Sequence, residues 1–224
     1  MKTGVLTAMT LLVMSSPTVA ITIDFDTDAA FNSLAAGTIV TEQYAAMGVH
    51  ISANNLVSGH PDLAIVFDSA NPTGDDGDLA TPGYHATNTI PYGKLLIIAE
   101  NATDSNGDGL VDDPDDEGGQ PAGWLNLALD FEQNQASFVF IDIEESGGTV
   151  DFRNNGSVVA TIGIPAMGDN SRVTAAYAGL TFDEVRVNFA GSAALAEIVL
   201  VPEPGSLALL CIGGLALMRR RIAA

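Results

Sequence analysis

The chain has little cysteine, few basic residues and few aromatics. Of its 224 residues, one is cysteine, eight are lysine or arginine, and 6% are aromatic. Because Cys211 is the single cysteine, no disulfide can form within the chain and hold its main part together. The scarcity of basic residues excludes the positive patches that bind nucleic acids and anionic lipids. One tryptophan and four tyrosines, scattered along the chain, predict no clustered aromatic platform for sugars.

Acidic residues are abundant instead. Between Ile21 and Val201 lie 27 of the 28 Asp and Glu residues but only four of the eight Lys and Arg residues, a surplus of 23 negative charges. Such a surface repels other anions and attracts divalent cations. A hydrophobic fraction of 47% and recurring strand patterns argue against disorder.

The motifs of common catalytic centres are missing. The chain has no Gly-x-Ser-x-Gly elbow, no His-Glu-x-x-His, no phosphate-binding glycine loop and no cysteine nucleophile before the tail. Asp142 and Glu144 are expected on one strand face, as solvent-facing acids or further cation ligands in preference to a glycosidase pair. We therefore expect a protein that is not an enzyme, with a polysaccharide hydrolase as the less favoured alternative.

The last 24 residues, VPEPGSLALLCIGGLALMRRRIAA, differ from the rest of the chain. Two prolines interrupt any preceding strand, and an apolar run from Gly205 to Met218 follows. As a helix this run would span about 21 Å, short of a bilayer core of about 30 Å. The arginines after it would stay on the cytoplasmic side. The residues that define the two borders of the run are Pro202, Glu203, Pro204, Arg219, Arg220 and Arg221.

This order of features resembles the PEP-CTERM sorting signal, and the resemblance covers residues 201–224 only. Proteins with that signal are exported by bacteria that make extracellular polysaccharide. The resemblance implies that an exosortase, a membrane transpeptidase-like enzyme, recognises and removes the tail. It also implies that the C-terminal apolar helix holds the chain in the membrane only transiently.

The N-terminus agrees with export. Lys2 precedes an apolar stretch from Val5 to Met14, and small residues end at Ala20. This pattern predicts a signal peptide over residues 1–20, cleaved after Ala20, and export through the inner membrane. After processing of both ends, the protein is expected at the cell surface or in the extracellular matrix.

Residues 21–200 are predicted to form one all-β domain. About ten short strands separated by Gly, Asn and Asp predict an antiparallel β-sandwich of jelly-roll type. In the run Trp124–Phe131, alternation places Leu125, Leu127, Leu129 and Phe131 on one face of the strand. Besides the tail, the one helix expected is Asp28–Ala35, which Asp28 would cap. The strands are predicted at Ile21–Asp26, Gly48–Ala53, Leu63–Phe67, Lys94–Ala99, Trp124–Phe131, Ser137–Ile143, Thr149–Arg153, Ser157–Ile162, Asp183–Phe189 and Ala194–Val201.

An acidic excursion after the fourth predicted strand has the spacing of a calcium loop. From Asp104 it reads DSNGDGLVDDPD, with oxygen side chains at positions 1, 3, 5, 9 and 12 and Gly109 at position 6. Calcium takes six to eight oxygen ligands, and the carbonyl at position 7 supplies one more. The predicted ligands are Asp104, Asn106, Asp108, the Leu110 carbonyl, Asp112 and Asp115.

The excursion resembles the calcium loops of EF-hands, dockerins and thrombospondin type 3 repeats. It departs from the EF-hand in having Asp115 at position 12, Pro114 at position 11 and no flanking amphipathic helices. These departures favour an isolated structural calcium loop, with a solvated acidic loop as the alternative. A second acidic segment, residues 68–78, has no defined ligand spacing, so whether it binds a second cation stays open.

We therefore expect an exported, calcium-stabilised, noncatalytic protein that is associated with exopolysaccharide. A calcium-dependent carbohydrate-binding module is the alternative, since Trp124 and the tyrosines are residue types that stack on sugars. A fold by itself is weak evidence for function.

Overall fold

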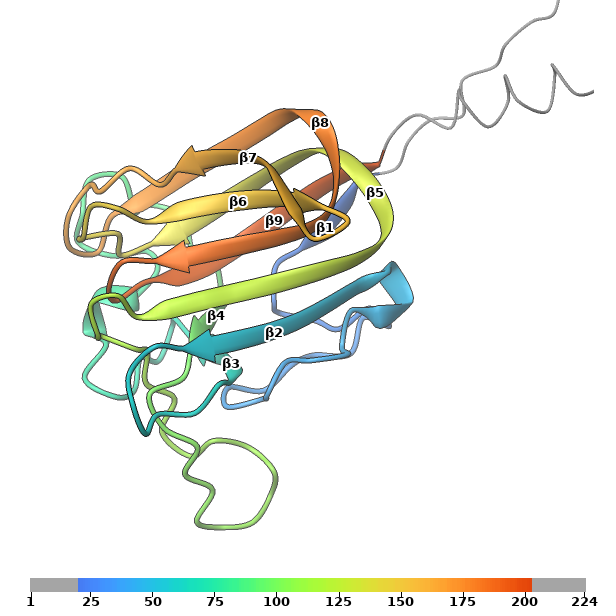
Figure 1. Cartoon of the computed structure of the whole chain (residues 1–224). Helices are drawn as coiled ribbons and strands as arrows, with labels where there is room; N and C mark the ends of the chain where they lie inside the picture. Colours follow the sequence, from blue (N-terminus) through green and yellow to red (C-terminus); the bar gives the residue numbers. More distant parts are fainter. Residues whose placement is uncertain (1–19, 203–224) are drawn as a thin grey trace, which may run out of the picture. The chain divides into compact units, whose positions relative to one another are not determined.

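The computed structural model describes residues 20–202, which form β-strands connected by loops (Figure 1). The predicted signal peptide, apart from Ala20, and the predicted C-terminal apolar helix lie outside the described residues. Within residues 20–202, no helix is long and apolar enough to cross a membrane.

The described strands join in one antiparallel sheet with the order β3-β4-β9-β5-β8-β6-β7. Off this path, β1 pairs with β9 and β2 pairs with β5, also antiparallel. The prediction of an all-β, antiparallel protein with almost no helix is confirmed. The elements are β1 (Ile21–Ile23), the 3-10 turn η1 (Ala45–Met47), β2 (Val49–Asn55), β3 (Ala64–Asp68), the 3-10 turn η2 (Gly77–Leu79), β4 (Lys94–Ile98), β5 (Gly123–Ile141), β6 (Thr149–Asn154), β7 (Ser157–Gly163), β8 (Arg172–Phe189) and β9 (Ala194–Pro202).

Strands β5 and β8 are much longer than the sequence predicted. The runs 124–131 and 137–143, predicted as two strands, belong largely to the single strand β5, whose register shifts between Ala128 and Gln135. Its first half pairs with β2 and its second half with β9, while β8 lies beside both halves. The largely polar residues 132–136, between the two predicted strands, indicate a loop. The backbone there continues its pairing through a bulge, which bends the strand.

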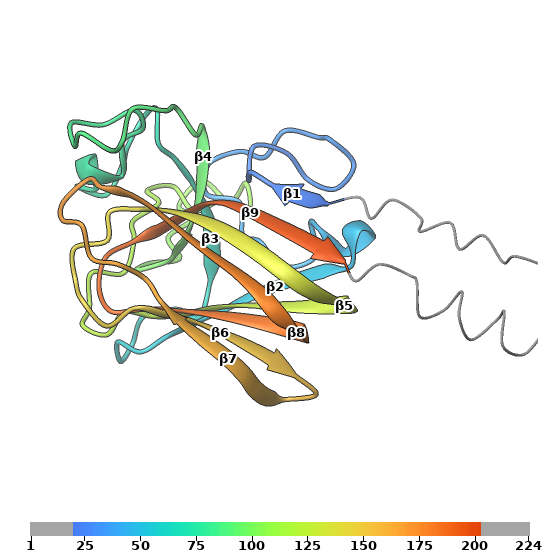
Figure 2. The same ribbon diagram turned by 90° about the horizontal axis from the view of Figure 1, so that it is seen from above.

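Both halves of β5 face the same core. Leu125 and Leu127 from the first half share one buried cluster with Phe138 and Phe140 from the second half. The bent sheet therefore folds over a common interior. Figure 2 shows β4 on one side of the described body and β6 and β7 on the other. Phe131, predicted on the same strand face as Leu125 and Leu127, is 68% exposed because it lies in the bend, where the alternation of the first half is interrupted.

The predicted helix Asp28–Ala35 is wrong. The segment forms turns, with an isolated bridge between Thr27 and Ser33. The Asp28 carboxylate accepts hydrogen bonds from the N–H groups of Ala30 at 2.8 Å and Asn32 at 2.9 Å. Asp28 therefore caps a turn, and the positive φ of 63° at Phe31 prevents a helical path through the segment.

Because β5 and β8 bend, both ends of each strand lie at the same end of the body, opposite the bend (Figure 1). The loops that follow β3, β5, β7 and β8 gather at this end, on the left of Figure 1. These loops carry the buried Asp142 together with the half-buried Asp76 and Asp78 and the exposed Asp169.

Candidate metal centre

Three carboxylates from three loops meet at this end of the sheet. Asp78 lies in η2 in the β3–β4 loop, Asp142 directly follows β5, and Asp169 lies in the β7–β8 loop. One oxygen of each lies within 4.8 Å of the other two. Among residues 20–202, this is the one set of three acidic, histidine or cysteine side chains that is drawn together so closely.

The spacing suits a hard divalent cation. Calcium–oxygen bonds of about 2.4 Å place two ligands on opposite sides of the ion about 4.8 Å apart. Asp78 also has one carboxylate oxygen, Oδ1, that is buried without a hydrogen-bond partner. Burial of an unpaired carboxylate oxygen is unfavourable unless a proton or a cation compensates it.

Asp142 is the most buried member of the set, with no exposed surface. Its φ of 62° turns the chain out of β5 and brings its side chain under the neighbouring loops. Oδ1 accepts a hydrogen bond from the Asn170 N–H at 2.6 Å, and Oδ2 accepts one from Ser192 Oγ at 3.2 Å. Burial, with smaller contributions from the charges of Asp78 and Glu144, raises the pKa of Asp142 to about 7.

Ser192 links Asp142 to a second acidic pair. Its Oγ also lies 2.9 Å from Asp116 Oδ2, and Asp116 in turn donates its N–H to Asp76 Oδ2 at 2.8 Å. Since Ser192 has one hydroxyl hydrogen, it can donate to only one of the two carboxylates at a time. Burial raises the pKa of Asp116, and burial together with the Asp116 charge raises the pKa of Asp76 to about 10.

The four basic side chains of the described body do not neutralise this cluster. Lys94 pairs with Asp68 at 2.7 Å, and Arg153 and Arg186 both lie beside Glu184. Arg172 bonds to the hydroxyl of Tyr92. Within residues 20–202, compensation of the clustered negative charge is therefore left to hydrogen bonds such as that from the Tyr84 hydroxyl to Asp169, to solvent at the exposed Asp169, to protons or to a bound cation.

The predicted calcium loop lies apart from the cluster and projects from the lower end of the body in Figure 1. Its backbone amides point at its own side-chain oxygens. Asp104 accepts hydrogen bonds from the N–H groups of Gly107 at 2.7 Å and Gly109 at 2.9 Å, and Asp112 accepts one from Ser105 at 2.7 Å. The backbone of the loop therefore curves around the side-chain oxygens of Asp104 and Asp112. Asn106 accepts from the Asp108 N–H at 2.8 Å, and Asp108 accepts from the Leu110 N–H at 2.9 Å.

Asp115, the sixth predicted ligand, is placed elsewhere. It is half-buried beside the β3–β4 loop, where a Cβ added to Gly74 would lie 2.7 Å from its Cβ. Burial, and then the nearby charges of Glu100 and Asp116, raises the pKa of Asp115 to about 6. The structure therefore groups Asp104, Asn106, Asp108 and Asp112 in the loop and Asp115 with the buried carboxylates.

The second acidic segment, residues 68–78, divides between two roles. Asp68 forms an ion pair with Lys94, while Asp76 and Asp78 enter the buried cluster. Asp116, Asp169 and Ser192 were missed as members of the cluster. The sequence around Asp169 does indicate a turn, because Asp169 lies between Gly168 and Asn170. Both of these neighbours adopt a positive φ in the structure.

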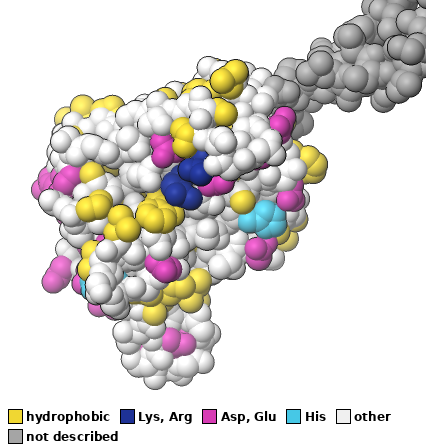
Figure 3. All heavy atoms as spheres, viewed as in Figure 1, with side chains coloured by type: hydrophobic (Ala, Val, Ile, Leu, Met, Phe, Trp, Pro, Cys, Tyr) yellow, Lys and Arg dark blue, Asp and Glu magenta, His cyan; other side chains and the backbone are white. Residues whose placement is uncertain are grey.

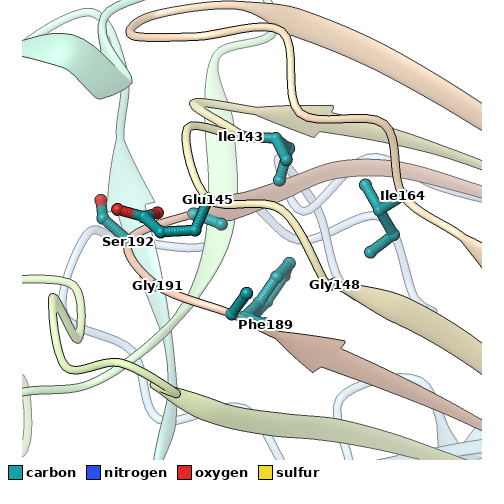
Figure 4. Close-up of a pocket in the computed structure, with 9 residues that line it drawn as sticks. Ile143, Glu145, Gly148, Ile164, Phe189, Gly191 and Ser192 are labelled. Atoms are coloured by element: carbon teal, nitrogen blue, oxygen red, sulfur yellow. The ribbon is translucent and has the colours of Figure 1, made fainter.

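A small cavity beside Ser192 is too small for a substrate. It measures about 10 Å³ and is lined chiefly by apolar side chains, among them Ile164 and Phe189. Figure 4 shows the Glu145 carboxylate and the Ser192 hydroxyl on one side of it. A space of this size holds at most one water molecule.

Comparison with known proteins identifies the C-terminal motif. The PEP-CTERM protein-sorting motif matches residues 200–222, which confirms the sorting signal predicted in the tail. The motif indicates an exported protein that is processed at its C-terminus. No curated protein matches the chain.

Several solved structures share weak likeness with the chain. A fucose-binding module of Streptococcus pneumoniae is 19% identical, with 38% of this chain and 68% of that chain covered and a TM-score of 0.30. The carbohydrate-binding module CBM6cm-2 of Cellvibrio mixtus lichenase 5A, in complex with cellotriose, is 16% identical, with 49% and 77% covered and a TM-score of 0.29. The enzymatically active domain of bacteriophage CBA120 tailspike protein 4 is 12% identical, with 69% and 19% covered and a TM-score of 0.33. At such TM-scores these likenesses carry no argument about this chain.

Proposed function

We propose that the mature chain is a noncatalytic protein of the cell surface or extracellular matrix, associated with extracellular polysaccharide and stabilised by calcium. The sorting motif at residues 200–222 supports export and removal of the tail by an exosortase. The bent sheet, whose two halves share one core, supports a β-sandwich of jelly-roll type.

The observation that carries the calcium proposal is the set Asp78, Asp142 and Asp169. Its oxygens lie within 4.8 Å of one another, and no lysine or arginine of residues 20–202 forms an ion pair with it. A divalent cation offsets the repulsion and desolvation of such a group better than protons do at neutral pH. We place a second, more exposed structural calcium in the loop of residues 104–112.

Thermal melting of the processed protein in calcium and in chelator tests this proposal. A ligand at a hundredfold its Kd stabilises the folded state by about 2.7 kcal/mol, which for a domain of this size raises Tm by roughly 5–10 °C. Asp142→Asn is expected to remove most of the increase in Tm that calcium causes by binding to Asp78, Asp142 and Asp169. Asp75→Asn is the matched control, because Asp75 is exposed in the β3–β4 loop that also carries Asp78, and its φ of 64° suits asparagine. A Tm indifferent to calcium and chelator would reject both sites.

A calcium-stabilised carbohydrate-binding module is the second candidate function. The observation that favours it is a polar sheet face on which Arg186 lies over the ring of Trp124, 5.0 Å from its centroid.

A polysaccharide hydrolase is a weaker candidate. The cavity nearest the buried carboxylates, at about 10 Å³, does not support it because it cannot hold a sugar.

A further inference from the structure

The outer face of the sheet formed by β2, β5, β8, β6 and β7 is polar and in regular register. The opposite side of the same strands carries core residues such as Leu127, Val187 and Phe152, all fully buried. The face turned to the viewer in Figures 1 and 3 therefore consists of the alternate residues of each strand. Three rungs cross this face: Asn54, Trp124, Asn188 and Thr149; Ser52, Asn126, Arg186, Asp151 and Thr161; and His50, Ala128, Glu184 and Arg153.

The centre of this face combines the one tryptophan of the chain with two of its arginines. Arg186 lies over the Trp124 ring at 5.0 Å and 3.6 Å from Glu184 Oε1, and Arg153 lies 3.3 Å from the same oxygen. Figure 3 shows basic side chains near the middle of the face, beside hydrophobic atoms. Half of the four basic residues of the described body are thus gathered in one place, although the body as a whole is strongly acidic.

The Arg186 side chain offers the central rung's exposed hydrogen-bond donors. It is 30% exposed, while its Nε and the Oδ1 of Asn126 are buried without a hydrogen-bond partner in the described residues. Asp151 is held by hydrogen bonds from Thr161 Oγ1 at 2.6 Å and Asn188 Nδ2 at 3.1 Å. The rung therefore presents the partly exposed Arg186 guanidinium next to the indole ring of Trp124, and the neighbouring side chains are already held in place by hydrogen bonds.

These groups match the chemistry of a sugar chain. A sugar ring offers hydroxyls that both donate and accept hydrogen bonds, and a C–H face that packs against an indole. Strands about 4.8 Å apart repeat such contacts along the rung. Asp151 and Glu184 balance Arg153 and Arg186, so the face carries no net charge while the surrounding body repels anions. This balance favours a neutral glycan over an acidic one.

We infer that this face binds a neutral, hydroxyl-rich polysaccharide chain, with Trp124 as the packing residue and Arg186 as the hydrogen-bonding residue. The inference rests on the proposed association with polysaccharide and gives it a location. The contact needs no calcium bridge, because the face lies on the strands and not in the acidic loops.

Because Trp124 is the only tryptophan, its fluorescence reports directly on this face. The full chain, expressed in the producing cells and purified in its processed form, is titrated with neutral glucose, mannose and galactose oligosaccharides and with oligogalacturonate. At least one neutral oligosaccharide is expected to change the tryptophan emission in a saturable way, with the Kd that calorimetry gives. The same titration in chelator, below the melting temperature, is expected to give the same Kd.

Substitutions separate this face from other surfaces. Trp124→Ala and Arg186→Ala are each expected to weaken binding tenfold or more by calorimetry, while Phe131→Ala, an exposed aromatic in the bend, leaves it unchanged. Three outcomes overturn the inference. The first is binding seen by calorimetry while the tryptophan emission stays unchanged. The others are a preference for oligogalacturonate and the absence of binding to any neutral oligosaccharide. Those outcomes leave the calcium-dependent rise in Tm and the loss of the tail unaffected, so the proposed function is judged separately.

Discussion

Replacement of Asp142 by asparagine tests the buried carboxylate cluster most directly. The asparagine side chain would keep the shape of the aspartate and the hydrogen bond from the Asn170 N–H. Its amide N–H₂ could donate to Ser192 Oγ, which frees the serine hydroxyl for Asp116. The substitution therefore removes a charge from the cluster with little change in packing.

The size of the effect follows from the pKa of Asp142. A folded-state pKa of about 7, against an ordinary value of 3.8, means that folding favours the protonated form. The corresponding stability is fully present below pH 3.8 and is lost as the pH rises through 7. At about 1.4 kcal/mol per pH unit, the total loss approaches about 4 kcal/mol, with roughly 2–3 kcal/mol of it between pH 5 and pH 8.

Urea unfolding of both proteins in metal-stripped buffer at pH 5 and pH 8 measures this difference. The asparagine variant is expected to be more stable than the wild type at pH 8 by up to about 4 kcal/mol, and the advantage is expected to shrink at pH 5. In millimolar calcium this advantage of the variant is expected to shrink, because calcium stabilises the wild type while the variant has lost a ligand. An asparagine variant that is less stable than the wild type at pH 8 without metal would refute the reasoning.

Three further predictions concern other parts of the chain. The mature protein is expected to lack everything after about Pro204 by intact mass, and replacing Arg219–Arg221 by glutamine is expected to leave an uncleaved precursor; an Arg219-containing peptide on the mature protein contradicts this. Asp108→Ala is expected to remove the calcium response of the exposed loop while the β-rich circular dichroism stays intact; an undiminished response excludes the loop as a site. Hydrogen bonds first to Glu42 and then to Asp130 raise the pKa of His50, so NMR titration of its imidazole is expected to show a midpoint above 6.5 that falls in Glu42→Gln; an unchanged midpoint in the variant argues against the pairing.

The strands were predictable where apolar and polar residues alternate. Val185, Val187 and Phe189 are buried, and Glu184 and Arg186 between them are partly exposed, as the alternation predicted. The first half of β8 was missed because alanine, threonine and glycine replace the β-branched residues that usually mark a strand. That half is a strand because it pairs with the second half of β5, which the local sequence cannot indicate.

The exposed calcium loop and the buried cluster differ in how far the sequence can predict them. The loop takes its oxygens from neighbouring positions, so spacing alone grouped Asp104, Asn106, Asp108 and Asp112. The cluster takes Asp78, Asp142 and Asp169 from three loops, and only the strand pairing brings those loops together.

The same topology decides what a cation at the cluster would do. In the unfolded chain these three carboxylates are far apart in sequence, so no preformed site exists there. Binding free energy at such a site therefore adds to the free energy of unfolding. It would also tie the β3–β4, β5–β6 and β7–β8 loops to one point at the end of the sheet. The acidic surplus, which opposes folding through self-repulsion without metal, would then stabilise the folded chain wherever calcium is available.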